Sequence, residues 1–301
     1  MKKTDFYRNA RTDIPGPLSG VRVLEATTTW AGPMCAAVLA DFGADVIKVE
    51  IPTGDISRAV PPNLPGTEFT VMHTTVNRNK RALSLDVRTE QGRDIFLQLA
   101  ASSDVMVENF KVGTMAGYGL GYDQLCAVKP DIVYVSITGW GQFGPNHEAA
   151  AYDPLAQAAS GFMSVTGSSD GPPTKAGTYL ADDLGGLHGA LGAMAALRHR
   201  DQTGEGQHVD VALQDALLFQ SNGLPTLGAM GVQPDRMGNE FGGATPANVY
   251  QCLDGAVFAG VLLDAHWRIL APIIGEPDLA DHESFATRSE RVINRELCNI
   301  L

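Results

Sequence analysis

The sequence has few cysteines, few aromatic residues and no long apolar run. Its four cysteines are scattered among the 301 residues without a C-x-x-C pair. This spacing argues against a disulfide framework and predicts no metal site. No apolar stretch reaches the about 20 residues that a membrane-spanning helix needs, and the N-terminal segment MKKTDFYRNARTDIPG lacks the apolar core of a secretory signal. We therefore expect a cytoplasmic globular protein with buried thiols and no membrane partner.

Positive charge is also scarce. The chain has 22 Lys and Arg against 34 Asp and Glu, a net charge of −12, which argues against nucleic acid as a partner. One basic cluster stands out in the stretch VNRNKRALSLDVR, formed by Arg78, Lys80, Arg81 and Arg88. It could meet an anionic ligand or be a solvated strand edge, and the sequence leaves both interpretations open.

Apolar strand patterns alternate with helical patterns along most of the chain. Strands are predicted at 21–26, 45–50, 82–86, 104–108, 132–137 and 207–212, and helices at 33–42, 90–101, 122–128, from Asp182 and from Asp215. This alternation predicts an α/β fold with a Rossmann-like, mostly parallel sheet. The first turn, residues 28–33, could hold an anion at a helix N-terminus. It lacks the G-x-G-x-x-G fingerprint, so a nicotinamide or flavin dinucleotide is not indicated.

Loops at predicted strand ends are candidate walls of a site. Residues 109–111 and 138–141 follow two strands, at the edge where open α/β sheets bind ligands. A later loop carries Gly242 and Gly243, whose freedom of backbone angles suits a lid, although an ordinary connection explains them equally well. A hairpin with Asp254-Gly255 as its turn and helices from His266 and Arg288 are predicted to follow.

Two adjacent carboxylates begin the strongly apolar helical stretch at 182–200. Asp182 and Asp183 could be N-caps, or one could be a nucleophile that the helix dipole keeps ionised. Gly185 and Gly186 in the predicted first turn suggest that another group approaches this backbone closely. Local features alone do not decide between the two roles.

Motifs in order along most of the chain resemble one family. They are LSGVRVLE…AGP, FGADVIKVE, NKRALSLDVR, DVMVENF, GWGQFGP, YDPLAQAASG, DDLGG and ALRHRDQTGEGQHVDVAL. The chain from Pro17 onward resembles a family III (class III) CoA-transferase of the CaiB/BaiF type, similar to formyl-CoA and carnitine CoA-transferases. The resemblance implies that Asp182 is the nucleophile, with Asp183 less favoured. It also implies an acyl-CoA and a carboxylic acid as substrates, no tightly bound cofactor, and an interlocked homodimer.

The same resemblance implies which residues hold CoA. They are Trp30, Ala31, Leu85, Arg88, Asn109, Phe110, Lys111 and Tyr152, with Gly242 and Gly243 in a substrate loop. Backbone N–H groups of the glycines at 185–186 or 242–243 would stabilise an oxyanion. The implied domains are 1–225, a CoA-binding domain with the catalytic Asp, and 226–301, a linker and the start of a small α+β domain. Members of the family are longer by roughly a quarter, so we expect a truncated chain that lacks their returning C-terminal segment.

Two departures and two alternatives accompany the resemblance. Ile51 and Gly117 stand where relatives carry arginine, so phosphate contacts differ. An α-methylacyl-CoA racemase of the same fold would use a His and an Asp as paired bases, but Tyr152 occupies the place of that histidine and is a poor base at neutral pH. His147 lies five positions before the place of that histidine, and His188 on the predicted helix is interpreted as structural. The other alternative is a non-catalytic acyl-CoA binder.

Overall fold

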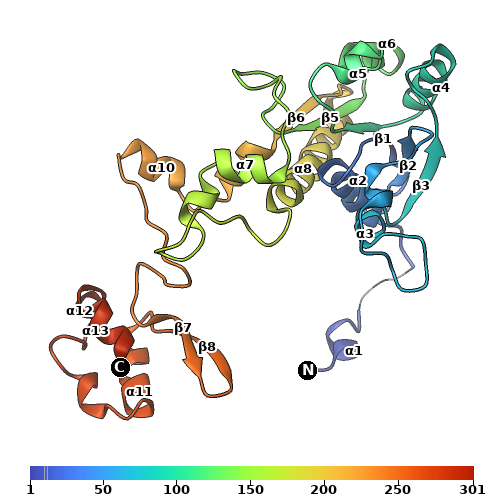
Figure 1. Cartoon of the computed structure of the whole chain (residues 1–301). Coiled ribbons are helices and arrows are strands. Elements are labelled where there is room, and N and C mark those ends of the chain that lie inside the picture. The colour runs from blue at the N-terminus through green and yellow to red at the C-terminus, as the bar shows by residue number, and fades with distance from the viewer. Residues whose placement is uncertain (10, 12) are drawn as a thin grey trace. The chain divides into compact units, whose positions relative to one another are not determined.

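The computed structural model describes residues 1–9, 11 and 13–301. Two positions of the N-terminal segment, for which no secretory signal was predicted, lie outside the described residues. The chain divides into two compact units (Figure 1). The first contains residues 1–162 and 176–226, and the second contains residues 163–175 and 227–301.

A six-stranded parallel sheet forms the centre of the first unit. Its strands are β1 (Arg22–Ala26), β2 (Asp45–Glu50), β3 (Lys80–Ser84), β4 (Val105–Glu108), β5 (Val133–Thr138) and β6 (His208–Ala212), in the order β3-β2-β1-β4-β5-β6. Val23 of β1 pairs with Val46 on one side and with Val105 on the other. The order reverses between β1 and β4, as in doubly wound dinucleotide-binding folds. The predicted α/β fold with a mostly parallel sheet is confirmed.

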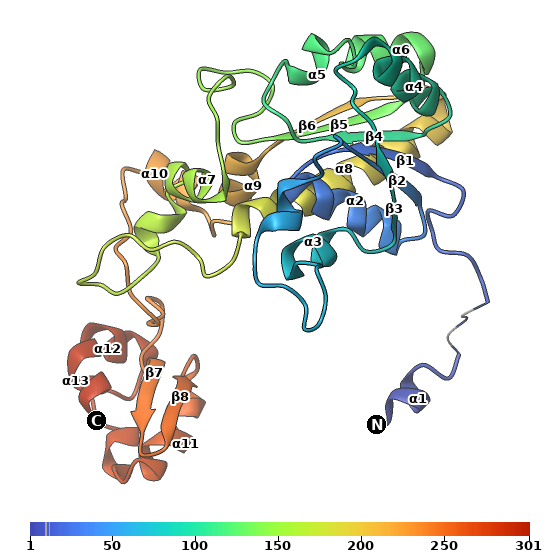
Figure 2. The same ribbon diagram turned by 45° about the vertical axis from the view of Figure 1, so that its right-hand side comes forward.

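Helices cover both faces of this sheet (Figure 2). Because side chains alternate along a strand, Val23 faces a core with α2 (Ala31–Asp41) and α8 (Leu180–Thr203), while Leu24 faces one with α4 (Glu90–Ala101) and α6 (Tyr122–Val128). Burial on both faces explains the nearly continuous apolar runs of the central strands.

Glycines let α8 lie unusually close to its neighbours. A Cβ atom added at Gly185 would lie 2.3 Å from Leu213 Cδ2, and one at Gly186 would lie 2.8 Å from the carbonyl oxygen of Ala31. At Gly189 it would lie 2.8 Å from Ile137 Cδ1. The close approach predicted at the first two glycines is therefore made by α2 and by Leu213.

Short helices were the elements least visible in the sequence pattern. Besides α9 (Leu213–Phe219), which starts two residues before Asp215, they are α1 (Lys3–Phe6), η1 (Ile56–Ala59), α3 (Val71–Val76), α5 (Thr114–Gly117), α7 (Asp153–Ala159), η2 (Phe162–Val165) and α10 (Leu224–Ala229). Each is too short to show a helical period. Over the described ranges, no helix combines the length and the apolar character that a bilayer crossing requires.

The second unit has its own small core. The antiparallel strands β7 (Ala247–Cys252) and β8 (Gly255–Gly260) are joined by Leu253-Asp254, one residue before the predicted turn. They are followed by α11 (Asp264–Ile273), η3 (Pro277–Ala280), α12 (Arg288–Ile293) and α13 (Arg295–Ile300). Trp267, Phe285 and Cys298 are buried together in this unit. Unusual backbone angles were expected at Gly242 and Gly243, but the positive φ in this loop is at Gly238, at 59°.

Candidate active site

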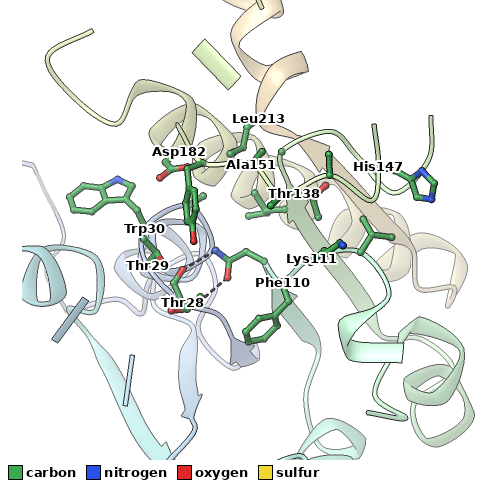
Figure 3. A pocket seen from close by; sticks show the side chains of 18 residues that line it. Thr28, Thr29, Trp30, Phe110, Lys111, Thr138, His147, Ala151, Asp182 and Leu213 are labelled. Carbon is green, nitrogen blue, oxygen red and sulfur yellow. Dashed lines mark hydrogen bonds between the residues drawn. The ribbon is translucent and has the colours of Figure 1, made fainter. Parts of the chain in front are cut away.

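A cavity of about 240 Å³ lies at the carboxyl ends of β1, β4 and β5. We call it the first cavity. Its walls come from the turn after β1, the segment after β4, the end of β5 with the loop that follows, and the first turn of α8. Figure 3 shows Trp30 and Asp182 on one side of it and Lys111 and His147 on the other. This edge includes the switch point between β1 and β4, where open parallel sheets place ligands.

The turn after β1 is held from two directions. Asn109 Oδ1 accepts from the Thr28 N–H at 2.9 Å, and Asn109 Nδ2 donates to the Thr28 carbonyl at 2.9 Å (Figure 3). From the other direction, Asp55 Oδ1 accepts from the Thr29 N–H and from Thr28 Oγ1, both at 3.1 Å. Thr29 has a φ of 72°, in the left-handed region that a branched residue rarely adopts. The four hydrogen bonds therefore fix a strained turn at the cavity wall.

Asp182 lies inside the helix rather than at its cap. Because α8 begins at Leu180, with Tyr179 as the capping residue, Asp182 and Asp183 occupy its first turn. Burial, together with the negative charges of Asp153 and Asp183, raises the pKa of Asp182 to about 7. The helix dipole was expected to keep this carboxylate ionised, whereas burial and two like charges act in the opposite direction and leave it partly protonated near neutral pH. Both carboxylates in the first turn are thus excluded as N-caps.

The two adjacent aspartates have different surroundings. Asp182 lines the first cavity, whereas Asp183 Oδ1 accepts a 2.6 Å hydrogen bond from Trp30 Nε1. The Trp30 ring also contacts the Tyr179 ring, with centroids 5.1 Å apart. Asp183 therefore holds the indole that forms one wall, while the carboxylate of Asp182 faces the empty space.

A second cavity of about 570 Å³ opens beside the first, at the ends of β2 and β3. Leu85, Val87 and Ile51 give it aliphatic walls, and Thr28 and Phe110 line both cavities. Its charged side chains include Glu50 and Arg58, joined by two hydrogen bonds of 2.7 and 2.8 Å. Two neighbouring spaces that share a wall suit a long ligand with one reactive end.

A network of buried charges supports this edge of the sheet. Lys48 Nζ lies 3.0 Å from Glu25 Oε1 and 3.1 Å from Asp55 Oδ2, and Lys80 Nζ lies 2.8 Å from Glu25 Oε2. The Lys80 side chain is 2% exposed, and burial lowers its pKa to about 8. Since its ammonium group is enclosed, the hypothesis that Lys80 meets a ligand's phosphates is wrong. Lys48 pairs with Asp55, and Asp55 accepts the hydrogen bonds from Thr28 and Thr29, so the network also stabilises the turn after β1.

The structure brings most of the predicted site residues together. Trp30, Ala31, Asn109, Phe110, Lys111, Tyr152 and Asp182 line the first cavity, and Leu85 lines the second. Arg88 lines neither, since its exposed guanidinium is paired with Asp86. Gly242 and Gly243 belong to the second unit, so their part in the site stays a prediction. Gly185 and Gly186 lie beyond the first turn, where helical N–H groups already have partners, so they are not oxyanion donors.

Several residues at the site were missed from the sequence. His147 and Leu213 line the first cavity, and Asp55 and Asp153 hold its walls, although no role was assigned to their carboxylates from the sequence. Thr138, which also lines the first cavity, belongs to the segment 138–141 that was predicted as a candidate wall. His188 is structural, as predicted, because its Nδ1 lies 2.8 Å from the Leu184 carbonyl of its own helix. Within the described ranges, no group of three or more His, Cys, Asp or Glu side chains is placed to hold a metal ion.

The fold is a doubly wound α/β fold with a cavity at its switch point, and the largely buried carboxylate of Asp182 lines that cavity. Residues 18–300 match the model of CoA-transferase family III. The chain is 40% identical over 289 residues to a succinyl-CoA:mesaconate CoA-transferase of Haloarcula hispanica, covering 93% of this chain and 72% of that protein. It is 41% identical over 300 residues to a succinate–glutarate CoA-transferase of Agrobacterium fabrum, covering 94% of this chain and 74% of that protein.

A solved structure agrees with these matches. The crystal structure of a CaiB/BaiF family protein from Brucella suis superimposes with a TM-score of 0.87 at 38% identity, covering 95% of this chain and 77% of that one. The chain belongs to CoA-transferase family III. Its reaction is the transfer of CoA between carboxylic acids, which confirms the predicted activity.

Proposed function

We propose that Asp182 is the nucleophile of this CoA transfer and that both cavities together hold the acyl-CoA. The observation that carries the proposal is the position of Asp182: among the described residues, it is the carboxylate that lines the first cavity, and its pKa is raised to about 7. A more basic carboxylate is a stronger nucleophile, and near neutral pH a large fraction of it is still ionised.

The reaction needs no further reactant. The Asp182 carboxylate attacks the thioester carbonyl of the donor, the C–S bond breaks, and a mixed anhydride and the CoA thiolate form. The thiolate attacks the aspartyl carbonyl of that anhydride, which releases the donor acid and leaves an aspartyl-CoA thioester. The acceptor carboxylate then attacks this thioester and expels the thiolate, giving a second anhydride. Attack of the thiolate on the acceptor's carbonyl forms the new acyl-CoA and frees Asp182.

Side chains of the first cavity suit these steps. The phenol of Tyr152 is a hydrogen-bond donor that would orient the thioester carbonyl. Thr28 and Phe110 line both cavities, so a pantetheine arm would pass between them from the second cavity to Asp182. Leu85 and Val87 would contact the nucleotide end of CoA. The CoA roles of Trp30, Ala31, Asn109, Arg88 and the loop of Gly242 and Gly243 remain part of the proposal.

The acids transferred are small, and we place dicarboxylic acids first among them. The two relatives described above are named for succinyl-CoA, mesaconate, succinate and glutarate. A cavity of about 240 Å³ suits acids of this size. Lys111 makes no ion pair within 4 Å with any described residue, so its ammonium is available to a second carboxylate. His147 lies along the same cavity.

The assembly and the compartment follow from weaker observations. We propose an interlocked homodimer, because the chain belongs to this family and exposes large apolar side chains such as Phe258 and Leu263 on its second unit. We propose the cytoplasm, because Cys35 and Cys298 are buried free thiols, as in proteins of reducing compartments. Light scattering of the purified protein tests the first of these.

Mass spectrometry tests the mechanism. The protein is incubated with succinyl-CoA, without acceptor and then with mesaconate or glutarate, and is digested to search for a CoA adduct. We expect the adduct on Asp182 and transfer of CoA to the acceptor. An adduct on Asp183, or transfer by an Asp182→Asn variant, would overturn the assignment. Exchange of the α-hydrogen of a chiral 2-methylacyl-CoA in deuterium oxide, without CoA transfer, would instead support the racemase.

A further inference from the structure

Asp153, at the start of α7, is a buried carboxylate that contacts the first turn of α8. Asp153 is 2% exposed. Asp153 Oδ1 accepts a hydrogen bond from the Ala181 N–H at 2.7 Å and a longer one from the Asp182 N–H at 3.4 Å. Since Tyr179 makes no side-chain cap, the capping acceptor of this helix comes from a residue far away in the sequence.

A second side chain fixes the orientation of Asp153. Gln157 Nε2 donates to Asp153 Oδ2 at 2.6 Å, and Gln157 Oε1 accepts from the Ala176 N–H at 2.8 Å. Gln157 is fully buried. The carboxylate therefore cannot rotate away from α8 without breaking the link between α7 and the segment that leads into the helix.

The charge of Asp153 also acts on Asp182. After burial, Asp153 is the largest of the influences that raise the pKa of Asp182, ahead of Asp183. Other titratable groups face the same cavity: Tyr152 at the start of α7, Lys111 after β4 and His147 after β5. Asp215 on α9 is exposed, and α2 presents its neutral first turn, Ala31-Gly32-Pro33, to this end of α8. The nearest fixed negative charges are thus Asp153 and Asp183.

We propose that Asp153 is a positioning residue for the nucleophile: it anchors the first turn of α8 and, through its negative charge, makes the Asp182 carboxylate a stronger attacking group. The inference rests on the proposed role of Asp182. The two effects work together, because an anchored backbone fixes the direction of the carboxylate while a like charge at the buried site increases its affinity for an electrophile as well as for a proton.

The test is the pH dependence of kcat/KM for CoA transfer, from pH 5 to pH 9, in the wild type and in Asp153→Asn. The wild type is expected to lose activity as pH falls through about 7, where Asp182 takes up a proton. Asp153→Asn keeps an oxygen for the Ala181 N–H but removes the charge. Its acid limb should move to lower pH by about one unit, and its plateau should fall several-fold because the nucleophile is weaker.

Two further variants separate charge from anchoring. Asp183→Asn is the matched control: it removes a charge of the same helix turn without touching the anchor, so its acid limb should also move down, by less. Asp153→Glu keeps the charge but displaces the anchor, so its acid limb should stay near that of the wild type while the plateau falls. Asp153→Ser is a second neutral variant, in case an amide facing Gln157 prevents folding, and thermal unfolding confirms that each variant is folded.

The results distinguish the inference from the proposed function. Transfer by Asp182→Asn would refute the nucleophile itself. If Asp182→Asn is inactive but folded Asp153→Asn or Asp153→Ser keeps the acid limb of the wild type, the proposed function stands and the inference about Asp153 is wrong. A downward shift of the limb in both neutral variants, with Asp153→Glu unshifted, supports it.

Discussion

The two cavities of the first unit each contain a carboxylate, and the pKa of the two carboxylates is shifted in opposite directions. Asp182 in the first cavity and Glu50 in the second both lie at carboxyl ends of the sheet, and burial raises the pKa of each. At Asp182 the neighbouring charges of Asp153 and Asp183 add to that effect. At Glu50 the hydrogen bonds from Arg58 and from the Asp55 N–H outweigh burial, so the net pKa is lowered. Burial raises the pKa of both carboxylates, so the direction of the net shift depends on whether the neighbouring groups are negative or positive.

This difference agrees with the proposal that one cavity binds the long ligand and the other carries out the chemical step. The larger cavity has aliphatic walls and a neutralised ion pair, which suits recognition of a long ligand. The smaller one holds a carboxylate that no cation among the described residues pairs with, and its raised pKa suits the proposed role as nucleophile. The turn at Thr28 and Thr29 lines the first cavity, and Thr28 also lines the second. The hydrogen bonds that hold this turn to Asp55 therefore affect both cavities.

The change with the largest expected effect removes the reactive carboxylate. Asp182→Asn should reduce CoA transfer by about a thousand-fold or more, because the covalent route is lost. It should leave the affinity for CoA within about twofold, since the second cavity is untouched. Activity assays and calorimetric titration with CoA measure the two quantities. A parallel loss of CoA affinity would show that the cavities are not separate in function.

The free energy of unfolding of Asp182→Asn at different pH values tests whether the pKa of Asp182 is raised in the folded protein. The folded protein raises the pKa of Asp182 from 3.8 to about 7, so ionisation of this group destabilises the fold increasingly as pH rises through that interval. Relative to the wild type, Asp182→Asn should therefore gain stability between pH 4 and pH 8, by up to about 4 kcal/mol. Urea unfolding at the two pH values measures it. An unchanged difference would mean that the carboxylate is not destabilised by its surroundings.

The next effect comes from a residue that serves both cavities. Asp55→Ala removes the acceptor for Thr28 and Thr29 and leaves Lys48 with one ion-pair partner fewer. We expect a loss of roughly 3 kcal/mol in stability, as for other broken buried pairs, together with a rise in KM for acyl-CoA and a lower kcat. Asp55→Asn, which retains an acceptor oxygen, should recover part of kcat. Full activity in a folded Asp55→Ala variant would contradict the role given to the turn.

The smallest effects are expected on the surface. Arg58→Ala frees Glu50 in the second cavity and should weaken CoA binding by about fivefold. Arg88→Ala, the control, removes an exposed arginine paired with Asp86 and should weaken it by about twofold or less, an effect that fades at high salt. Calorimetric titrations at two salt concentrations compare them. A larger loss at Arg88 would favour the phosphate role that the family resemblance implies.

The sequence predicted the parallel sheet because its strands are buried on both faces. Runs such as 105–107 and 133–135 are apolar at consecutive positions, so their prediction did not depend on finer signals. Through the family resemblance it also placed Asp182 at the site, where the residue lines the first cavity, whereas two acids before an apolar helix did not by themselves decide between a cap and a nucleophile. It did not predict Asp153 and Asp55, whose partners lie 28 and 26 positions away in the chain. Nor did it predict the raised pKa of Asp182, because the dipole is local whereas burial is a property of the folded chain.

The glycine-lined face of α8 sets a limit on how this enzyme can be redesigned. A side chain added at Gly186 would push α8 away from the backbone of Ala31, and one at Gly185 or Gly189 would force Leu213 or Ile137 to shift. A displaced α8 would carry the proposed nucleophile Asp182 with it, so these positions would affect the proposed active site. Libraries that aim to change the acid specificity should therefore leave α8 intact and vary the loop after β5, around His147 and Ala151, which lines the first cavity from the other side.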